Sequence, residues 1–131
     1  MYEFHGWFSL SDNTYDMISE RVDEALPEIQ AHLDRFEGRS LIIDLRWLNG
    51  IPTVTLQGEL NRRLGYGDLL TELLDLLARR LPGSYGLVYE RDDERVDPPG
   101  GNAFRVRVLA RGAVTERDDP FLSPSRPVIE D

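Results

Sequence analysis

The residues that could do chemistry in this chain are few and scattered. The two histidines, His5 and His32, fall on different predicted elements. His5 could act as a general base beside Asp44 if the two shared a sheet face, but no nucleophile motif accompanies them. A single histidine on a strand is more often structural. The sequence therefore predicts no catalytic residues, and an enzyme that uses His5 with a sheet carboxylate is the least favoured alternative.

Acidic residues gather in one segment that follows a predicted strand. They are Asp92, Asp93, Glu94 and Asp97. This cluster has neither the spacing of an EF-hand loop nor its turn glycine. A second candidate, the glycines around Tyr66, precedes a predicted helix, whose N–H groups attract anions. That stretch lacks the lysine of a phosphate-binding loop, and Asp68 would repel an anion. We therefore predict no metal site and no cofactor.

The charge balance restricts the partners that the chain can bind. It carries 24 acidic and 15 basic residues, for a net charge of −9. Nucleic acids and anionic membranes are bound mainly through excess Lys and Arg, so we expect neither as a partner. A basic protein remains compatible with this charge. The first residues lack the pattern of a signal peptide, and no apolar run approaches the roughly 20 residues that span a bilayer. We expect a cytoplasmic protein.

The stretch 41–57 predicts a β-hairpin, around which the other elements are arranged. Asn49 and Gly50 stand between two β-rich runs, and both residue types tolerate the positive φ of a tight hairpin turn. Alternation gives the hairpin one apolar face and one mixed face. The apolar face carries Ile43, Leu45, Trp47, Val54 and Leu56.

The remaining pattern predicts the element order β-α-β-β-α-β-β. Further strands are expected at 2–10, 85–90 and 104–111, with apolar helical stripes at 18–36 and 69–81. Residues 113–115 are expected to extend the last strand. This order predicts one α+β domain, 1–131. Its mixed, mainly antiparallel sheet has about five strands and two helices on one face, related to the ferredoxin-like plait. Residues 116–131 are expected to form an irregular tail packed on the body.

If both helices cover one face of this sheet, the other face is open. It would present residues from four strands: His5, Trp7, Asp44, Arg46, Thr53, Thr55, Arg105 and Arg107. Tryptophan beside arginine is a combination enriched at protein interfaces. The alternative is that the acids and arginines pair with one another across the strands and are structural.

Both ends of the chain resemble one protein family. The start reads YEFHGW at 2–7 and is followed by an acidic helix, while the end reads ERDDPFLSP at 116–124 and PVIE at 127–130. These motifs are similar to the immunity protein 7 family of bacterial polymorphic toxin systems. The resemblance implies a small cytoplasmic inhibitor that binds and blocks a secreted toxin made beside it. It supplies no catalytic residues.

We therefore expect an immunity protein that neutralises a cognate toxin domain through an acidic and aromatic surface. An acidic inhibitor would associate quickly with a basic, nuclease-type toxin, and more slowly at high salt. The predicted contact residues are His5, Trp7, Asp44, Arg46, Tyr66, Tyr89, Asp92, Asp93, Glu94, Arg105 and Arg107. The alternative function is a small-molecule-binding or regulatory α/β plait domain that uses the open sheet face. The sequence leaves the oligomeric state open.

Overall fold

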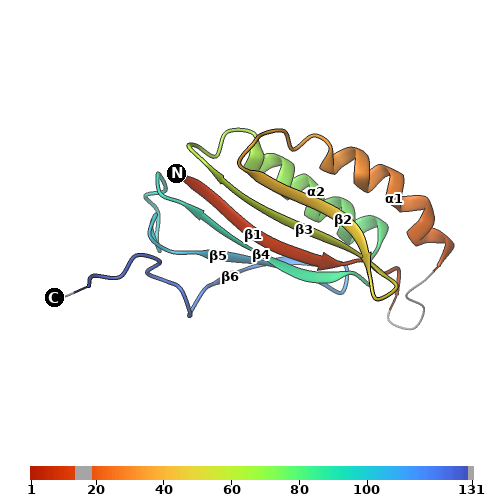
Figure 1. Ribbon diagram of the computed structural model, residues 1–131. Coiled ribbons are helices and arrows are strands. Elements are labelled where there is room, and N and C mark those ends of the chain that lie inside the picture. Colours follow the sequence, from red (N-terminus) through yellow and green to blue (C-terminus); the bar gives the residue numbers. More distant parts are fainter. Residues whose placement is uncertain (14–18, 130–131) are drawn as a thin grey trace.

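The computed structural model describes residues 1–13 and 19–129, and both of its helices lie on one face of a single sheet (Figure 1). The elements are β1 (Tyr2–Ser9), α1 (Glu20–Leu33), β2 (Leu41–Leu48), β3 (Ile51–Leu60), α2 (Tyr66–Arg80), β4 (Tyr85–Asp92), β5 (Arg105–Ala110) and β6 (Ala113–Asp118). The sheet order is β2-β3-β1-β4-β5-β6. The α+β class is confirmed, with one strand more than expected.

Every pair of neighbouring strands in the sheet is antiparallel. The two helical connections join strands that run in the same direction, but neither pair is adjacent. β3 lies between β1 and β2, and β1 lies between β3 and β4. The crossovers therefore produce no parallel pair, which is why the expected mixed sheet is entirely antiparallel among the described strands.

The predicted hairpin forms as its turn residues indicate. Asn49 and Gly50 take φ values of 51° and 79°, and the flanking residues Leu48 and Ile51 oppose each other. Across the strands, the apolar face pairs Leu45 with Val54 and, one step further, Ile43 with Leu56. Val54 and Leu56 are fully buried. The turn therefore sets a register that directs one face of both strands into the core.

β1 lies in the interior of the sheet and supplies its largest core side chains. Tyr2, Phe4 and Phe8 are fully buried on the side that faces the helices. The helices cover them with apolar stripes: Val22, Ala25, Ile29 and Leu33 of α1, and Leu70, Leu73, Leu74 and Leu77 of α2. Fully burying one such side chain is worth about 1.5–3 kcal/mol. The core therefore holds both helices on this one face.

The region after β5 differs from the prediction. Residues 113–115 do not extend β5, because Arg111 and Gly112 form a turn with φ values of 55° and 69°. The chain returns as β6 beside β5. The irregular segment consequently begins at Asp119 and not at Glu116. The pair Arg111-Gly112 between two β-rich stretches is the sequence signal for this turn and hence for a sixth strand.

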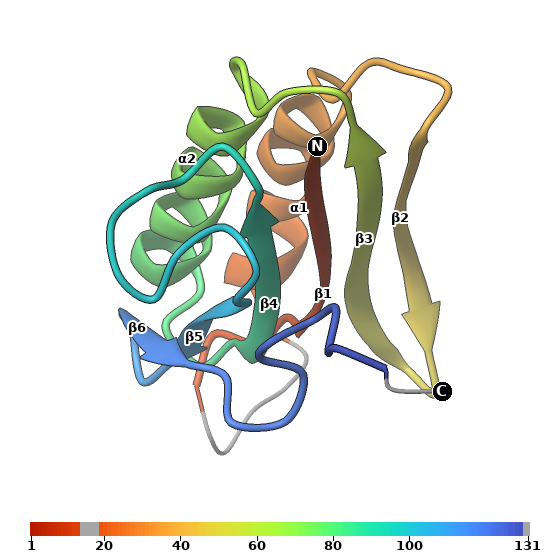
Figure 2. The same cartoon turned by 90° about the vertical axis from the view of Figure 1, so that its left-hand side faces the viewer.

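The tail after β6 lies on the side of the sheet away from the helices (Figures 1 and 2). The backbone N–H of Phe104 donates to Ser123 Oγ at 2.9 Å, and that of Ser125 donates to the Asn102 carbonyl at 2.9 Å. The apolar tail residues Phe121 and Val128 are themselves exposed. Hydrogen bonds with residues before β5 therefore hold the tail on this side of the sheet.

Gly6 is required by close packing between β1 and β4. A Cβ atom at this position would lie 2.7 Å from Val88 Cβ and 2.9 Å from the Leu87 carbonyl oxygen. The register of β1 is regular on both sides, so the glycine marks a close approach and no bulge.

We predict that Gly6→Ala lowers the free energy of unfolding by about 1–3 kcal/mol, since neither Val88 nor the β4 backbone can move without disturbing the core. Denaturant unfolding measures this change. Gly65→Ala is the control, because no atom lies within 4 Å of its added Cβ and its φ is −76°. Equal stability of the two variants would contradict this view of Gly6.

Candidate functional site

The face of the sheet opposite the helices is organised in rows that cross the strands. Residues opposite each other on neighbouring strands point to the same face. One row contains Asp44, Thr55, Trp7 and Leu87, from β2 to β4. The next contains Ile42, Gln57, His5 and Tyr89. The register therefore brings five predicted contact residues onto one face, since Arg46 follows in the adjoining row.

Large apolar side chains remain exposed on this face. Trp7 is 44% exposed, and its ring meets the 52% exposed Tyr85 edge-on, with 6.0 Å between ring centroids. On the same face, Asp44 and Arg46 of β2 form an ion pair at 2.5 Å, and Thr55 of β3 lies between Asp44 and Trp7 in the row. We call this surface the open-face patch and define it as Trp7, Ile42, Asp44, Arg46, Thr55 and Tyr85. An aromatic centre with a polar surround is typical of protein interfaces.

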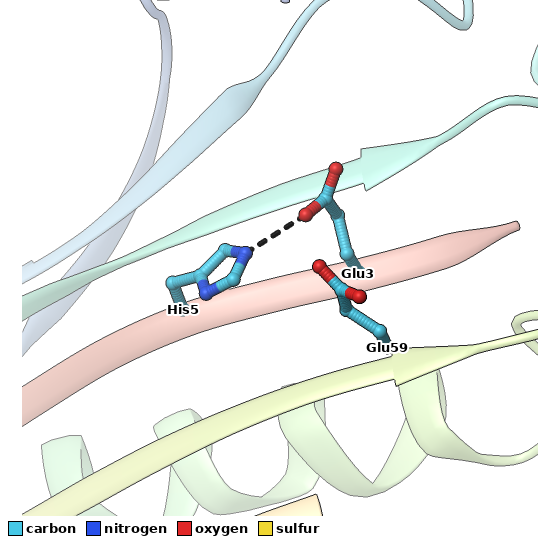
Figure 3. Close-up of side chains that lie close together, drawn as sticks. All are labelled: Glu3, His5 and Glu59. Atoms are coloured by element: carbon cyan, nitrogen blue, oxygen red, sulfur yellow. Dashed lines mark hydrogen bonds and ion pairs between the residues drawn. The ribbon is translucent and has the colours of Figure 1, made fainter. Parts of the chain in front are cut away.

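At one end of the same face, Glu3 joins two basic side chains. His5 Nε2 lies 2.9 Å from Glu3 Oε2 (Figure 3), and Arg91 Nε donates to Glu3 Oε1 at 2.7 Å. Burial opposes the charged form of Glu3, but the hydrogen bonds from His5 and Arg91 outweigh it and lower the pKa of the carboxyl. The partner of His5 is therefore Glu3. Asp44, the partner of His5 considered from the sequence, lies on β2, and β3 separates it from β1.

These side chains also form a potential metal-ligand set with Glu59. The ligand atoms of Glu3, His5 and Glu59 lie within 4.8 Å of one another (Figure 3). One imidazole and two carboxylates suit a divalent transition metal such as zinc. A cation would have to displace the hydrogen bond between His5 and Glu3 and lie near the buried Arg91 guanidinium. The sequence analysis missed this group, because Glu59 comes beside Glu3 only through the pairing of β1 with β3.

Arg105 and Arg107 lie on the other face of the sheet, so their expected place on the open face is wrong. Arg107 pairs across the strands with the core residue Val88 and donates to Thr71 Oγ1 of α2 at 2.6 Å. Alternation alone shows that both arginines share a face, but not which face meets the helices. The strand is oriented by Leu109, which shares their face and is fully buried in the core.

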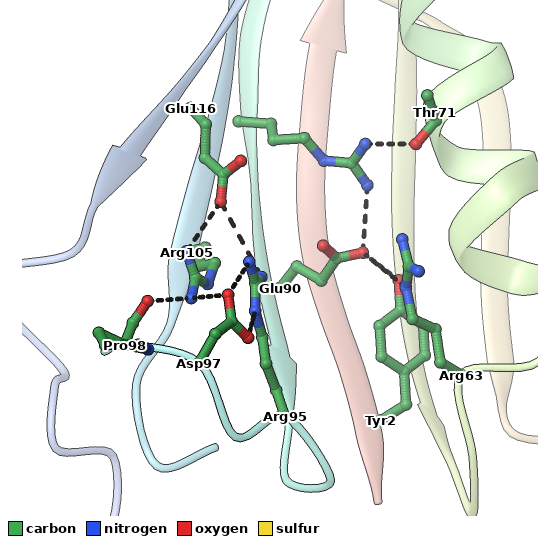
Figure 4. Close-up of polar contacts among 10 residues, drawn as sticks. Tyr2, Arg63, Thr71, Glu90, Arg95, Asp97, Pro98, Arg105 and Glu116 are labelled. Atoms are coloured by element: carbon green, nitrogen blue, oxygen red, sulfur yellow. Dashed lines mark hydrogen bonds and ion pairs between the residues drawn. The ribbon is translucent and has the colours of Figure 1, made fainter. Parts of the chain in front are cut away.

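The two arginines line a polar pocket at the end of the sheet beside α2 (Figure 4). Its volume is about 370 Å³, and its walls include Arg63, Glu90, Arg95, Arg105, Arg107 and Glu116. Arg107 donates to Glu90 at 3.1 Å, and Arg105 donates to Glu116 at 3.2 Å. Tyr2 also donates its hydroxyl to Glu90, and burial first, then this carboxylate, raises the tyrosine pKa. Acids and arginines thus pair with one another on the helix side of the sheet, whereas the structural alternative expected such pairs on the open face.

The other predicted contact residues lie away from the open-face patch or contact other groups of the chain. Tyr66 begins α2 and donates its hydroxyl to the Glu37 carbonyl at 2.7 Å. The Tyr89 ring meets Phe104 edge-on at 6.0 Å. In the acidic segment, Asp93 pairs with the N-terminal amino group, and Asp92 accepts from the Glu94 N–H at 3.1 Å. These acids help to fix the segment that follows β4.

The structure is one antiparallel sheet with both helices on one face and exposed aromatic side chains on the other. A family model described as immunity protein 7 matches residues 1–131, the whole sequence. The chain therefore belongs to the immunity protein 7 family. Comparisons with curated proteins and with solved structures gave no match. Within the part of the chain that the structure describes, no helix is long and apolar enough to cross a membrane.

The pairing of Glu3 with Arg91 predicts a loss of stability in acid. The folded-state pKa of Glu3 is below its ordinary value of 4.5, so ionised Glu3 stabilises the fold at neutral pH. This contribution is present above about pH 4.5 and is lost as the pH falls through the lowered pKa. Glu3→Gln should cost about 3 kcal/mol at pH 7, because it leaves Arg91, 4% exposed, without its countercharge.

Denaturant unfolding between pH 7 and pH 3 measures this effect. The difference between the parent and Glu3→Gln should shrink as the pH falls. Glu59→Gln, at an exposed position on the same face, should change stability by less than about 0.5 kcal/mol. A difference between parent and Glu3→Gln that stays constant across this range would show that the charge of Glu3 contributes nothing.

Proposed function

We propose that the protein binds and neutralises a cognate secreted polymorphic toxin, and that the open-face patch occludes the toxin domain. Membership of the immunity protein 7 family supports the class of partner. The observation that carries the choice of surface is Trp7, which stays 44% exposed on a sheet face that neither helix covers. Inhibition in this proposal is steric and requires no chemistry from the inhibitor.

The patch has the properties that tight binding requires. A few desolvated aromatic or arginine side chains carry most of the energy in protein interfaces. The edge-on contact with Tyr85 holds the Trp7 ring in place, and a rigid β-strand carries its backbone. Preorganisation of this kind reduces the entropy lost on binding. The adjacent Asp44 and Arg46 offer both signs of charge to a partner, which favours specificity.

The overall charge favours a basic partner. The chain has a net charge of −9, and part of its negative charge lies on the exposed surface of α1, at Asp23, Glu24 and Glu28. Opposite charges would accelerate the encounter with a basic toxin, and salt would slow it. We propose that the partner is of the basic, nuclease type and that the complex forms in the cytoplasm of the producing cell. His5 and Tyr89 adjoin the patch and are proposed as secondary contacts.

We predict that Trp7→Ala weakens binding to the toxin encoded beside this gene by at least about 2 kcal/mol, or roughly thirtyfold in Kd. The matched control is Trp47→Ala. Trp47 is 51% exposed, but it lies on the helix side of β2, next to Leu26 and Pro27 of α1. Titration calorimetry with the purified toxin domain gives both constants.

Growth of a strain that expresses the toxin provides a second readout. The parent and Trp47→Ala should restore growth, while Trp7→Ala should do so only at higher expression. Failure of the parent chain to bind the toxin would contradict the proposed function. Tight binding that survives Trp7→Ala but not Trp47→Ala would leave the function in place and reject the surface.

A further inference from the structure

The outer edge of β2 is unusually accessible for pairing with another strand. β2 is one border of the sheet and has eight residues with a regular register to β3. Natural edge strands are commonly blunted by prolines, lysines, bulges or short length. β2 has no proline, lysine or bulge, its two charges, Asp44 and Arg46, are of opposite sign, and its side chains Ile42, Trp47 and Leu48 are 61%, 51% and 48% exposed. The opposite border, β6, is shorter and contains Glu116, Arg117 and Asp118.

The hairpin determines which backbone groups of β2 point outward. Residues that flank a two-residue turn form a hydrogen-bonded pair, and such pairs then alternate along the hairpin. Leu48 opposes Ile51, so Leu48, Arg46 and Asp44 direct their backbone groups toward β3. The N–H and C=O groups of Ile43, Leu45 and Trp47 consequently point to the free side. These are the groups that an added antiparallel strand would bond.

The sequence of β2 is complementary to itself in one antiparallel register. If a two-fold axis passes through Leu45, Asp44 faces Arg46 of the second copy, and Arg46 faces Asp44. Ile42 then faces Leu48, and Ile43 faces Trp47. In this register, each β2 residue whose backbone groups point away from β3 lies opposite another such residue. Backbone hydrogen bonds between the two copies require this arrangement. Axes through Asp44 or Arg46 would place like charges opposite each other, which destabilises strand pairs.

We propose that two copies of this chain associate through β2 in this register and form one continuous antiparallel sheet. The groove between α1 and β2 extends the contact beyond the strand. Its lining is Asp23, Leu26, Pro27, Gln30, Leu45, Trp47 and Pro52, in which Asp23 is the one charged residue. Glu28, on the same helix, is turned toward Arg80 of α2. Repulsion between two acidic molecules is thereby limited at this edge. The inference does not depend on the proposed toxin.

Charge reversal at the two paired positions tests the register directly. Sedimentation velocity of the full chain, from about 1 to 300 µM, should show a dimer. Asp44→Arg alone would place arginines opposite arginines, and Arg46→Asp alone would place aspartates opposite aspartates. Each single variant should raise the dimer dissociation constant at least about tenfold. Both positions are on the surface, and circular dichroism confirms that each variant is folded.

An equimolar mixture of the two single variants should restore the dimer, because each arginine then faces an aspartate in both directions. A heterodimer in the mixture cannot result from misfolding of either chain, and together with the weakened dimers of both single variants it supports the axis through Leu45. A parent chain that stays monomeric at about 300 µM would overturn the proposal. A dimer that persists in both single variants would also overturn it. The same holds if the chain is monomeric and its β2 edge binds only the toxin.

Discussion

The packing of both helices against the same side of the sheet is the interaction on which the rest of this structure depends. Phe4 and Phe8 of β1 and the leucine stripe of α2 form one core, and each is fully buried there. This arrangement uses both amphipathic helices and leaves none for the second face of the sheet. Residues on that face must therefore be satisfied by one another, be covered by the tail, or remain exposed.

All three outcomes occur on the second face, and together they limit where the proposed contact surface can lie. Glu3, His5 and Arg91 satisfy one another at one end. Phe104 is buried between the rings of His5 and Tyr89 and is fastened to the tail at Ser123. The exposed remainder comprises the open-face patch together with Leu48, Gln57 and Glu59. The proposed contact surface lies within this remainder.

Local signals were sufficient to predict the parts of the fold that local chemistry controls. Asn49-Gly50 fixed the hairpin, because the turn requires positive φ at both positions. Alternation along β1 correctly separated its buried aromatic side chains from Trp7. The same alternation also indicates the contact between Glu3 and His5, because the two residues are two apart on one strand and must share a face.

The errors concern relations between distant segments. The orientation of β5 depends on Leu109 entering a core built by other elements, so the face of Arg105 and Arg107 could not be read from alternation alone. The ion pair of Glu3 with Arg91 needs the pairing of β1 with β4, which are far apart in the chain. The β1 and β2 residues of the open-face patch could be predicted from the sequence. Tyr85 could not, because it comes close to Trp7 only through the pairing of β1 with β4.

Of the two tryptophans, Trp7 lies in the proposed toxin interface and Trp47 lies outside it. The most direct measurement is therefore ¹⁹F NMR of the protein labelled with 5-fluorotryptophan, titrated with the toxin domain. The account predicts that the Trp7 resonance shifts or broadens on binding, while the Trp47 resonance stays at its free position. A Trp47 resonance that responds while that of Trp7 remains unchanged would contradict it.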